Sequence, residues 1–439
     1  MLEVHRTHRA KILNHVQVED SLDRHGWSAS KLWNVANYHS QQVWEETGEI
    51  PDHGDLKDKL KAHPKYKGLH SQSSQRVLEE LAEAFNSWYG KRVSDSRANP
   101  PGYRKKNYYD QQGRRVHEEH PRSTVTWKQN GIKHDAKNNR VRLSKGANHK
   151  EHPKAWEYIL VEYETRPVVT VENLQQVRAV YDKAKQRWEL HLVCKDEIET
   201  PTTPGNESAG VDLGICNFAA VAYSTKEADL YPGNRLKQDG YYFPKEIAKC
   251  DDSGGDRAAR LHHKWSERRT HFFHSLSKHV VQRCVEQEVG RINIGNLEGV
   301  REDGNGDSKN WGKHGNLDLH GWAFDRFTKI LTYKAKVEGI EVVEVSERDT
   351  SKTCCMCGRE DESQRVERGL YVCETCDAAF NADVNGAENI RLDLNQSNSE
   401  SAPRLGGDRS TGWLAQPGVY LHDLSRGFQP RTEVVDCKP

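Results

Sequence analysis

The sequence lacks any long apolar run. Hydrophobic residues make up 35% of its 439 residues and the mean hydropathy is −0.92, and no stretch approaches the roughly 20 apolar residues that a helix needs to cross a bilayer. The first residues also lack the charged, apolar and small-residue pattern of a signal peptide. We therefore expect no membrane association and a cytoplasmic location, associated with the nucleoid if nucleic acid is the partner.

An excess of charge of either sign is lacking as well. The chain has 65 basic and 65 acidic residues, whereas proteins that bind nucleic acid usually carry a positive excess. Two interpretations are open: nucleic acid is not the partner, or acidic residues cover outer faces while basic residues gather on inner ones. Acidic surfaces of the second kind suit a salt-rich cytoplasm, where charge attraction is strongly screened.

Without an export signal, the ten cysteines are expected to be thiols and metal ligands of a reducing compartment. Two CxxC pairs stand out, Cys354/Cys357 and Cys373/Cys376, separated by the spacing of a zinc ribbon. Four thiolates satisfy a tetrahedral Zn²⁺ and leave no open position for chemistry, so we predict a structural zinc. Cys355 adjoins a ligand and is interpreted as a spare thiol.

The first half of the chain combines helical and β patterns. Apolar residues recur at helical spacing in 29–46 and in 71–89, and plain core packing is the simplest explanation for them. Short β patterns fill 123–199, and the PTTPG sequence from Pro201 is a linker.

Between Asn99 and Arg122 basic residues alternate with tyrosines, a mixture that fits phosphate contacts and base stacking. A solvated loop is the alternative. The candidate nucleic-acid contacts here are Arg104, Lys105, Lys106, Tyr108, Arg114 and Arg115.

In the second half of the chain, the hydrophobic pattern predicts apolar strands separated by helices. This order favours an α/β fold, with a mixed sheet covered by helices. Functional residues of such sheets follow the carboxyl ends of the parallel strands, and the residues at those positions are Asp212, Gly295 and Glu347. The helical stretch 256–288 is strongly basic, which suits a nucleic-acid backbone, although a solvated face is the alternative. Its candidate contacts are Arg257, Arg260, Lys264, Arg268 and Arg269.

A second carboxylate, Asp383, opens a short helical pattern in NADVNGAENI, directly after the second CxxC pair. Two or three carboxylates at one edge of a sheet can hold two Mg²⁺ ions about 4 Å apart, one to activate water and one to stabilise the leaving oxygen of a phosphodiester. Mg²⁺ is a hard ion and prefers such oxygen ligands.

Together these motifs resemble the TnpB family, transposon-encoded RNA-guided DNA endonucleases related to type V CRISPR effectors and to eukaryotic Fanzor proteins, and formerly called OrfB-type transposases. The resemblance rests on GVDLG, on TSKTCCMCG with YVCETC, and on NADVNGAENI, and less on LHSQSSQRVLEELAEAFNSW near the N-terminus. It implies an RNase H-like (RuvC) core with an inserted zinc ribbon. It also implies a guide RNA from the transposon end, a double-stranded DNA target and cleavage with Mg²⁺.

One motif departs from the family. Its second RuvC motif usually runs IEDL, with the catalytic Glu at the strand end, but here the matching residues are IGNL, with Gly295 at the position of that Glu. Fanzor-like members carry this Glu on the strand before the zinc ribbon, and the sequence ERDTSKTC places Glu347 there. The loop acids Glu298 and Glu302, or an inactive nuclease, are the alternatives.

The resemblance implies a catalytic Mg²⁺ site of Asp212, Glu347 and Asp383. We expect a wedge-like β-rich domain (1–14 and 91–205) carrying a helical insertion (15–90), and a RuvC-like domain (206–350 and 377–394). A zinc ribbon (351–376) and a largely disordered tail (395–439) complete the chain. A catalytically silent RNA-guided DNA-binding protein and a transposase acting directly on transposon ends are the rival functions. The sequence does not indicate an oligomeric state.

Overall fold

The computed structural model describes residues 1–95, 97–104, 107–109, 111–112, 114–118, 120–149, 157–252, 255–296, 323–367, 369–393 and 412–431. The chain divides into two compact units, Met1–Glu199 and Thr200–Pro439. Each is described by itself, and the finer domain boundaries expected from the sequence stay a prediction.

The first unit is built on an antiparallel sheet of seven strands in the order β4-β8-β9-β1-β7-β6-β5. The strands are β1 (Leu2–Ile12), β4 (Val125–Lys128), β5 (Ile132–Asp135), β6 (Arg140–Ser144), β7 (Tyr158–Glu164), β8 (Leu174–Asp182) and β9 (Arg187–Ile198). A separate hairpin of β2 (Asn107–Tyr109) and β3 (Arg115–Glu118) lies within the segment where basic residues and tyrosines alternate.

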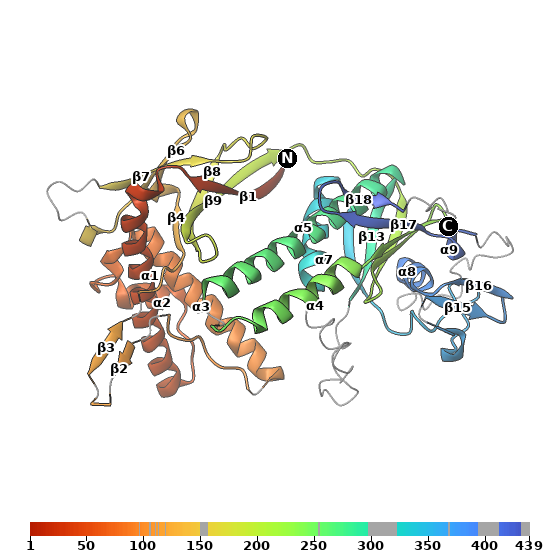
Figure 1. Ribbon diagram of the computed structural model, residues 1–439, viewed down its shortest axis with the longest axis horizontal. Helices are drawn as coiled ribbons and strands as arrows, with labels where there is room; N and C mark the ends of the chain where they lie inside the picture. Colours follow the sequence, from red (N-terminus) through yellow and green to blue (C-terminus); the bar gives the residue numbers. More distant parts are fainter. Residues whose placement is uncertain are drawn as a thin grey trace. The chain divides into compact units, whose positions relative to one another are not determined.

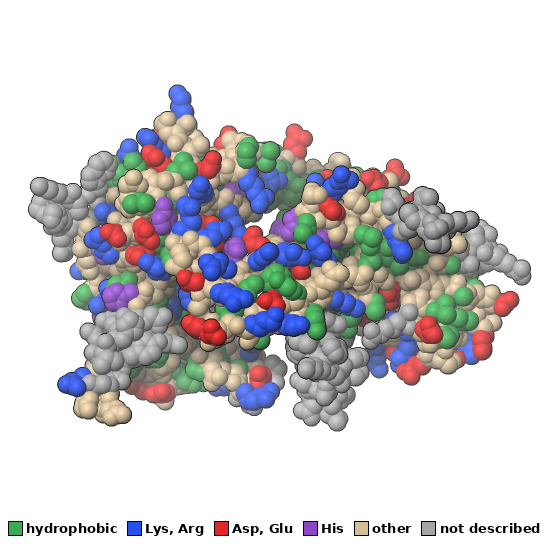
Figure 2. Space-filling view, viewed as in Figure 1, with side chains coloured by type: hydrophobic (Ala, Val, Ile, Leu, Met, Phe, Trp, Pro, Cys, Tyr) green, Lys and Arg blue, Asp and Glu red, His purple; other side chains and the backbone are tan. Residues whose placement is uncertain are grey.

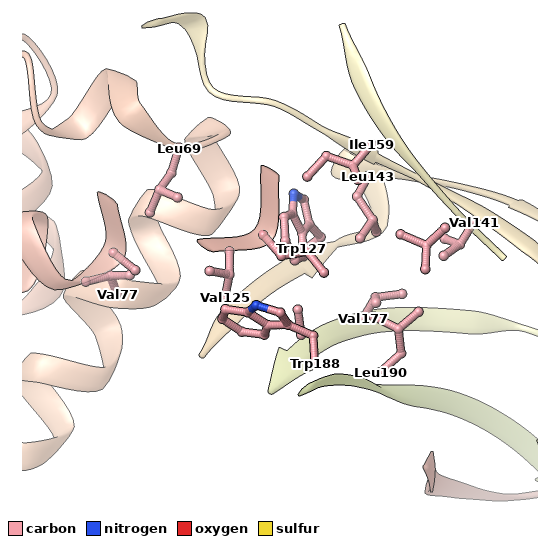
Figure 3. Packing of buried hydrophobic residues seen from close by; sticks show 14 of the residues in the cluster. Leu69, Val77, Val125, Trp127, Val141, Leu143, Ile159, Val177, Trp188 and Leu190 are labelled. Carbon is pink, nitrogen blue, oxygen red and sulfur yellow. The ribbon is translucent and has the colours of Figure 1, made fainter. Parts of the chain in front are cut away.

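Three helices accompany this sheet: α1 (His15–Thr47), α2 (His53–Leu60) and α3 (Ser71–Ser94). The apolar stripe of α3, including Val77 and Leu81, is buried, as expected for core packing. It joins one cluster with Trp127 and Trp188, which are fully buried. Figure 3 shows these two indole rings lying between the helical side, marked by Val77, and the strand residues. Burying two such large side chains makes this cluster the principal core of the unit.

The second unit contains a mixed sheet in the order β14-β13-β10-β11-β12-β17-β18. Strand β13 is parallel to both β10 and β14, whereas β10, β11 and β12 form an antiparallel meander (Figure 1). The strands are β10 (Glu207–Leu213), β11 (Asn217–Tyr223), β12 (Glu227–Pro232), β13 (Val289–Asn296), β14 (Glu341–Ser346), β17 (Gly418–Asp423) and β18 (Gly427–Pro430).

Helices cover both faces of this sheet. Alternate side chains of each strand point to opposite faces, and the two faces belong to two different apolar clusters. Val211 belongs to the cluster that α5 (Asp256–Glu286) and α7 (Phe324–Val337) complete, and Ala220 belongs to the cluster that α8 (Ala382–Leu392) completes. Helix α4 (Asn234–Ala248) packs against α5. The β–α order of the sequence therefore predicted a mixed sheet between helices correctly.

The two cysteine pairs lie between β14 and α8. Cys373 ends β15 (Leu370–Cys373) and Cys376 precedes β16 (Ala378–Asn381), and these two strands form an antiparallel hairpin that contacts α8. We call residues 350–381 the cysteine module. It shares an apolar cluster with α8 and with β12, so the module and the sheet are packed as one body.

The expectation of a largely disordered tail is wrong for residues 412–431. This segment forms α9 (Gly412–Ala415) and the hairpin β17–β18, and β17 extends the sheet by pairing parallel to β12. Leu414 and Phe428 are buried in the two clusters of the unit. Ser, Asn, Pro and Gly dominate the sequence before it and mask a short strand signal, whereas the open edge of β12 supplies the pairing partner. Residues 394–411 and 432–439 lie outside the described residues.

Candidate active site

The cysteine module gathers Cys354, Cys357, Cys373 and Cys376. Their sulfur atoms all lie within 4.8 Å of one another, and the Sγ–Sγ distances are 3.8 Å for Cys354–Cys376 and 3.6 Å for Cys357–Cys373. Tetrahedral Zn²⁺ with Zn–S bonds of about 2.3 Å would separate its sulfurs by about 3.8 Å. The four cysteines therefore fit a zinc ion. In the part of the chain that the structure describes, they are the one group of three or more His, Cys, Asp or Glu side chains this close together.

Cys355 lies outside this cluster and is buried in the apolar core of the module. Its backbone N–H donates to Oδ1 of Asn385 on α8. The Asn385 amide in turn donates to the carbonyl of Thr353, and Asn389 donates to the carbonyls of Thr350 and Thr353. Both asparagines are buried, so these hydrogen bonds fix the first CxxC turn on α8.

Helix α8 begins at a side-chain cap that also orients Asp383. Asn381 Oδ1 accepts hydrogen bonds from the backbone N–H groups of Asp383 and Val384, which places Asp383 in the first helical turn. Asn217, in β11, donates from Nδ2 to Oδ2 of Asp383 over 2.8 Å. The carboxylate of Asp383 is thus held by the helix start and by the sheet.

Asp212 lies in β10 and faces α8. A Cβ atom built on Gly386 would lie only 2.8 Å from Oδ2 of Asp212, so the carboxylate occupies space that a side chain at position 386 would need. Burial is the main cause that raises the pKa of Asp212, and the negative charge of Asp383 adds to it. The two carboxylates are therefore close enough to repel each other.

Glu347 follows β14 and lies over the end of the neighbouring strand β13. A Cβ atom at Gly295 would be 2.1 Å from Oε1 of Glu347 and 2.5 Å from its Cγ. The side chain of Glu347 therefore fills the position that a residue with a side chain at 295 would occupy. Burial raises the pKa of Glu347, and the charge of Asp212 raises it further.

The three carboxylates fit a hard cation. Oε1 of Glu347 is buried and makes no hydrogen bond within the described residues, which leaves an acceptor without a donor. The charge of Asp383 raises the pKa of Asp212, and the charge of Asp212 raises the pKa of Glu347, so Asp212 interacts with both other acids. Within the described residues, the three carboxylates do not form a group in which one oxygen from each residue lies within 4.8 Å of the others.

Among the residues that the structure describes, a cation also reaches this site, and the sequence did not indicate it. Arg365, in the insert between the two CxxC pairs, donates from Nη2 to Oδ1 of Asp383 over 3.4 Å. It also lowers the pKa of Asp212, although less than burial and Asp383 raise it. A basic residue in a polar insert carries no signal of its own, because only the fold of the cysteine module brings it to Asp383.

The predicted nucleic-acid contacts differ in how free their side chains are. Arg257, Arg260 and Lys264 are exposed on α5, and Figure 2 shows Lys and Arg side chains gathered over the part of the molecule that α4 and α5 occupy in Figure 1. Arg268 is tied to Asp239 of α4 by a 2.7 Å ion pair, and Arg269 is partly buried beside Trp265. Arg268 is thus better placed to hold the two helices together than to contact a ligand.

In the first unit, Arg104 lies 3.6 Å from the centre of the Trp33 ring and 3.5 Å from Glu80, so protein groups surround it. Arg114 is exposed. Lys105, Lys106 and the side chains of Tyr108 and Arg115 lie outside what the structure describes, as do Glu298 and Glu302. The roles of all these residues in binding or catalysis stay predictions.

Two sequence profiles match this chain. The family described as "Probable transposase" covers residues 191–301, and the one described as "Cas12f1-like, TNB domain" covers residues 324–390. TnpB-like protein ORF457 of Acidianus two-tailed virus is 26% identical over 428 residues, covering 88% of this chain and 86% of that protein. These matches support membership of the TnpB family.

A CRISPR-associated endodeoxyribonuclease, Cas12f1 of Sulfoacidibacillus thermotolerans, is 25% identical to this chain over 235 residues, covering 48% of the chain and 52% of that protein. The cryo-EM structure of a Cas12f1–sgRNA–target DNA complex aligns over 85% of this chain and 82% of that one, with a TM-score of 0.56 and 14% identity. This likeness shows the fold, a mixed α/β arrangement like that of the RuvC-like Cas12 nucleases. No helix within the described ranges is long and apolar enough to span a membrane.

Proposed function

We propose that this chain is a transposon-encoded, RNA-guided DNA endonuclease that cleaves phosphodiester bonds at Asp212, Glu347 and Asp383 with Mg²⁺. The relatives support the reaction class, since one is named an endodeoxyribonuclease and the similar fold comes from a complex with guide RNA and target DNA. The carboxylate site supports the chemistry, because Mg²⁺ prefers such oxygen ligands.

The observation that carries the proposal is the position of Glu347. Its carboxylate lies in the space above Gly295, with Oε1 buried and without a hydrogen-bond donor. Retaining a buried acid beside another acid is costly unless a cation joins them. A glutamate moved from strand β13 to the end of strand β14 therefore restores the third carboxylate of the site.

The protein's own groups prepare the site for the reaction. Asp212, Glu347 and Asp383 would hold the metal, and Asn217 holds Asp383 in one orientation. Arg365 is placed to contact a non-bridging phosphate oxygen next to Asp383, since its guanidinium presents several donors. Bound Mg²⁺ would activate water and stabilise the leaving oxygen.

Zinc at Cys354, Cys357, Cys373 and Cys376 would have a structural role. Four sulfurs leave no open coordination position, and the module is fixed to α8 next to Asp383. The zinc would therefore hold the insert that carries Arg365 without taking part in the reaction.

Exposed basic residues on α5 would contact the nucleic-acid backbone, while base pairing with the guide RNA would read the target sequence. Arg257, Arg260 and Lys264 are the candidates on α5 whose side chains remain exposed. A balanced net charge is compatible with this role because the candidates lie close together on one helix.

The test is cleavage of a plasmid library by the chain purified with its own transposon-end RNA, in the presence and absence of Mg²⁺. We expect cleavage that requires the RNA and the metal, and loss of cleavage but not of DNA binding in Asp212→Ala. Target binding by the wild type without cleavage would favour a silent DNA-binding protein. Joining of transposon ends without RNA would favour a transposase.

A further inference from the structure

Arg365 reaches Asp383 from a short turn, and one buried side chain is among the groups that hold that turn. The turn runs from Asp361 to Arg365, and Gln364 within it is only 3% exposed although it is polar. The Arg365 side chain is partly exposed, and it donates a 3.4 Å hydrogen bond to Asp383. A long arginine side chain loses considerable rotamer freedom when it is fixed in one position, so its placement depends on the rigidity of the turn.

The side chain that holds the turn is Tyr371, which is fully buried in β15. Its ring stacks on Phe380 of β16, with 5.7 Å between ring centroids and an interplanar angle of 14°. Its hydroxyl oxygen lies 2.9 Å from the side-chain oxygen of Gln364 and 2.9 Å from the backbone carbonyl oxygen of Lys352. Tyr371 therefore joins the turn before Arg365 to the segment that leads from Glu347 to Cys354.

The single proton of the Tyr371 hydroxyl determines which of these two contacts is a donated hydrogen bond. A phenol has one proton, so Tyr371 can donate to only one of the two oxygens. Donation to the Lys352 carbonyl leaves the hydroxyl as an acceptor, and the side-chain nitrogen of Gln364 is a buried donor without a partner within the described residues. Rotation of the Gln364 amide by 180° lets this nitrogen donate to Tyr371, which satisfies both groups.

We propose that Tyr371 is a positioning residue for the nuclease reaction: its hydroxyl fixes Gln364, and thereby holds Arg365 beside Asp383. The proposal rests on the proposed function, because Arg365 contributes only if the carboxylates cleave DNA. The cysteine module then has a second role besides binding zinc, because the hairpin that contains Cys373 also contains the hydroxyl that positions Arg365. Neither the CxxC spacing nor the carboxylate motifs requires a hydroxyl at this position.

The experiment compares Tyr371→Phe with Tyr163→Phe, in the protein purified with its RNA. Tyr163 is the matched control, because it is equally buried and its hydroxyl also makes one side-chain hydrogen bond, to His134, but in the other unit. Both variants keep the aromatic ring. Zinc content, target binding, the single-turnover cleavage rate and hydrogen–deuterium exchange of residues 361–367 are measured for each.

We expect Tyr371→Phe to keep its zinc and its target binding, to cleave about tenfold more slowly, and to exchange faster at 361–367. Tyr163→Phe should cleave at the wild-type rate. In an Arg365→Ala background, Tyr371→Phe should slow cleavage less than about twofold, because a residue that acts through Arg365 has nothing left to position.

Equal cleavage by the two Tyr→Phe variants would overturn the proposal, and so would an unchanged tenfold effect in the Arg365→Ala background. If Tyr371→Phe loses zinc, Gln364→Leu tests the same hydrogen bond from the exposed turn, and a wild-type rate in that variant would also overturn it. If the wild type itself does not cleave, the proposed function fails. Exchange at 361–367 then decides separately whether Tyr371 fixes the turn.

Discussion

At the scale of single residues, Gly295 and Glu347 are best understood as a pair. Position 295 tolerates no side chain because Glu347 lies there, and Glu347 has room only because position 295 is glycine. The two residues are 52 positions apart in the sequence, but adjacent parallel strands bring them together. The glutamate that strand β13 lacks is thus supplied by its neighbour, β14.

The pair predicts a rescue experiment. Glu347→Ala should abolish cleavage, and Gly295→Glu alone should also impair it, because the new side chain collides with Glu347. The double variant Gly295→Glu/Glu347→Ala should recover part of the activity, since it returns a carboxylate to the same edge of the sheet. Single-turnover cleavage rates measure this, and a double variant no better than Glu347→Ala would show that the two positions are not equivalent.

Arg365 gives a second prediction at this scale. Arg365→Ala should slow cleavage by about 100-fold, because it removes the described cation that contacts the carboxylates. Arg359 is the matched control: it lies in the same module with a similarly exposed side chain, but it pairs with Asp361 at 2.9 Å. An equal effect of Arg359→Ala and Arg365→Ala would mean that the module, and not the guanidinium at Asp383, was disturbed.

Residue patterns predicted some of this site and missed the rest for physical reasons. Ligand spacing identified the four cysteines that the structure brings together, and strand ends identified Asp212 and Glu347. Arg365 was missed because no local pattern marks a side chain whose position depends on a folded insert. Arg268 was predicted as a nucleic-acid contact, but sequence alone cannot show that Asp239 lies opposite it.

At the scale of elements, helix α1 carries a buried histidine that should make the first unit acid-sensitive. Burial lowers the pKa of His25 to about 3, and the charges of His149, Lys145 and Arg24 add to the effect. Its Nδ1 donates to the Ser21 carbonyl over 2.6 Å, and Nε2 has no described partner. The neutral ring is therefore the form that the folded state accommodates.

The sign of the pH dependence follows from this depressed pKa. Below the unfolded value of about 6.5 the unfolded chain binds a proton that the folded chain excludes, so stability is complete above pH 6.5 and is lost as the pH falls toward 3. At pH 5 the loss should be about 2 kcal/mol.

Urea unfolding at pH 7.5 and pH 5, followed by tryptophan fluorescence, measures this difference. His25→Gln should lose less stability between the two pH values than the wild type, while the exposed His53→Gln should behave like the wild type. The same acid loss in all three proteins would exclude His25 as its cause.

The terminal hairpin β17–β18 gives a prediction about an element that the sequence did not reveal. Phe428 is 4% exposed and packs against Phe272 and Tyr231, so Phe428→Ala should cost about 3–5 kcal/mol of stability in the second unit. Leu421, on β17 and 44% exposed, serves as the control, and Leu421→Ala should cost little. Thermal unfolding compares the two. Equal melting temperatures for Phe428→Ala and the wild type would mean that this hairpin is not part of the folded core.

At the scale of the whole molecule, the order of strands and helices was enough to predict a mixed sheet between helices. It was not enough to predict the outer strands, because a strand of six residues within a polar, Gly-rich tail has almost no periodic signal. The neutral net charge likewise gives no sign of a local basic surface, because composition does not show that Arg257, Arg260 and Lys264 lie on one helix.

The central claim is that Asp212, Glu347 and Asp383 form one Mg²⁺-dependent nuclease site. The most direct measurement is single-turnover cleavage of a target plasmid by the chain with its guide RNA, comparing Glu347→Ala with Glu344→Ala. Glu344 is an exposed acid on β14, the strand that Glu347 follows, so it matches the loss of an acid but not the position. We predict that Glu347→Ala binds the target and does not cleave, while Glu344→Ala cleaves at the wild-type rate. Cleavage by Glu347→Ala at the wild-type rate would contradict the account.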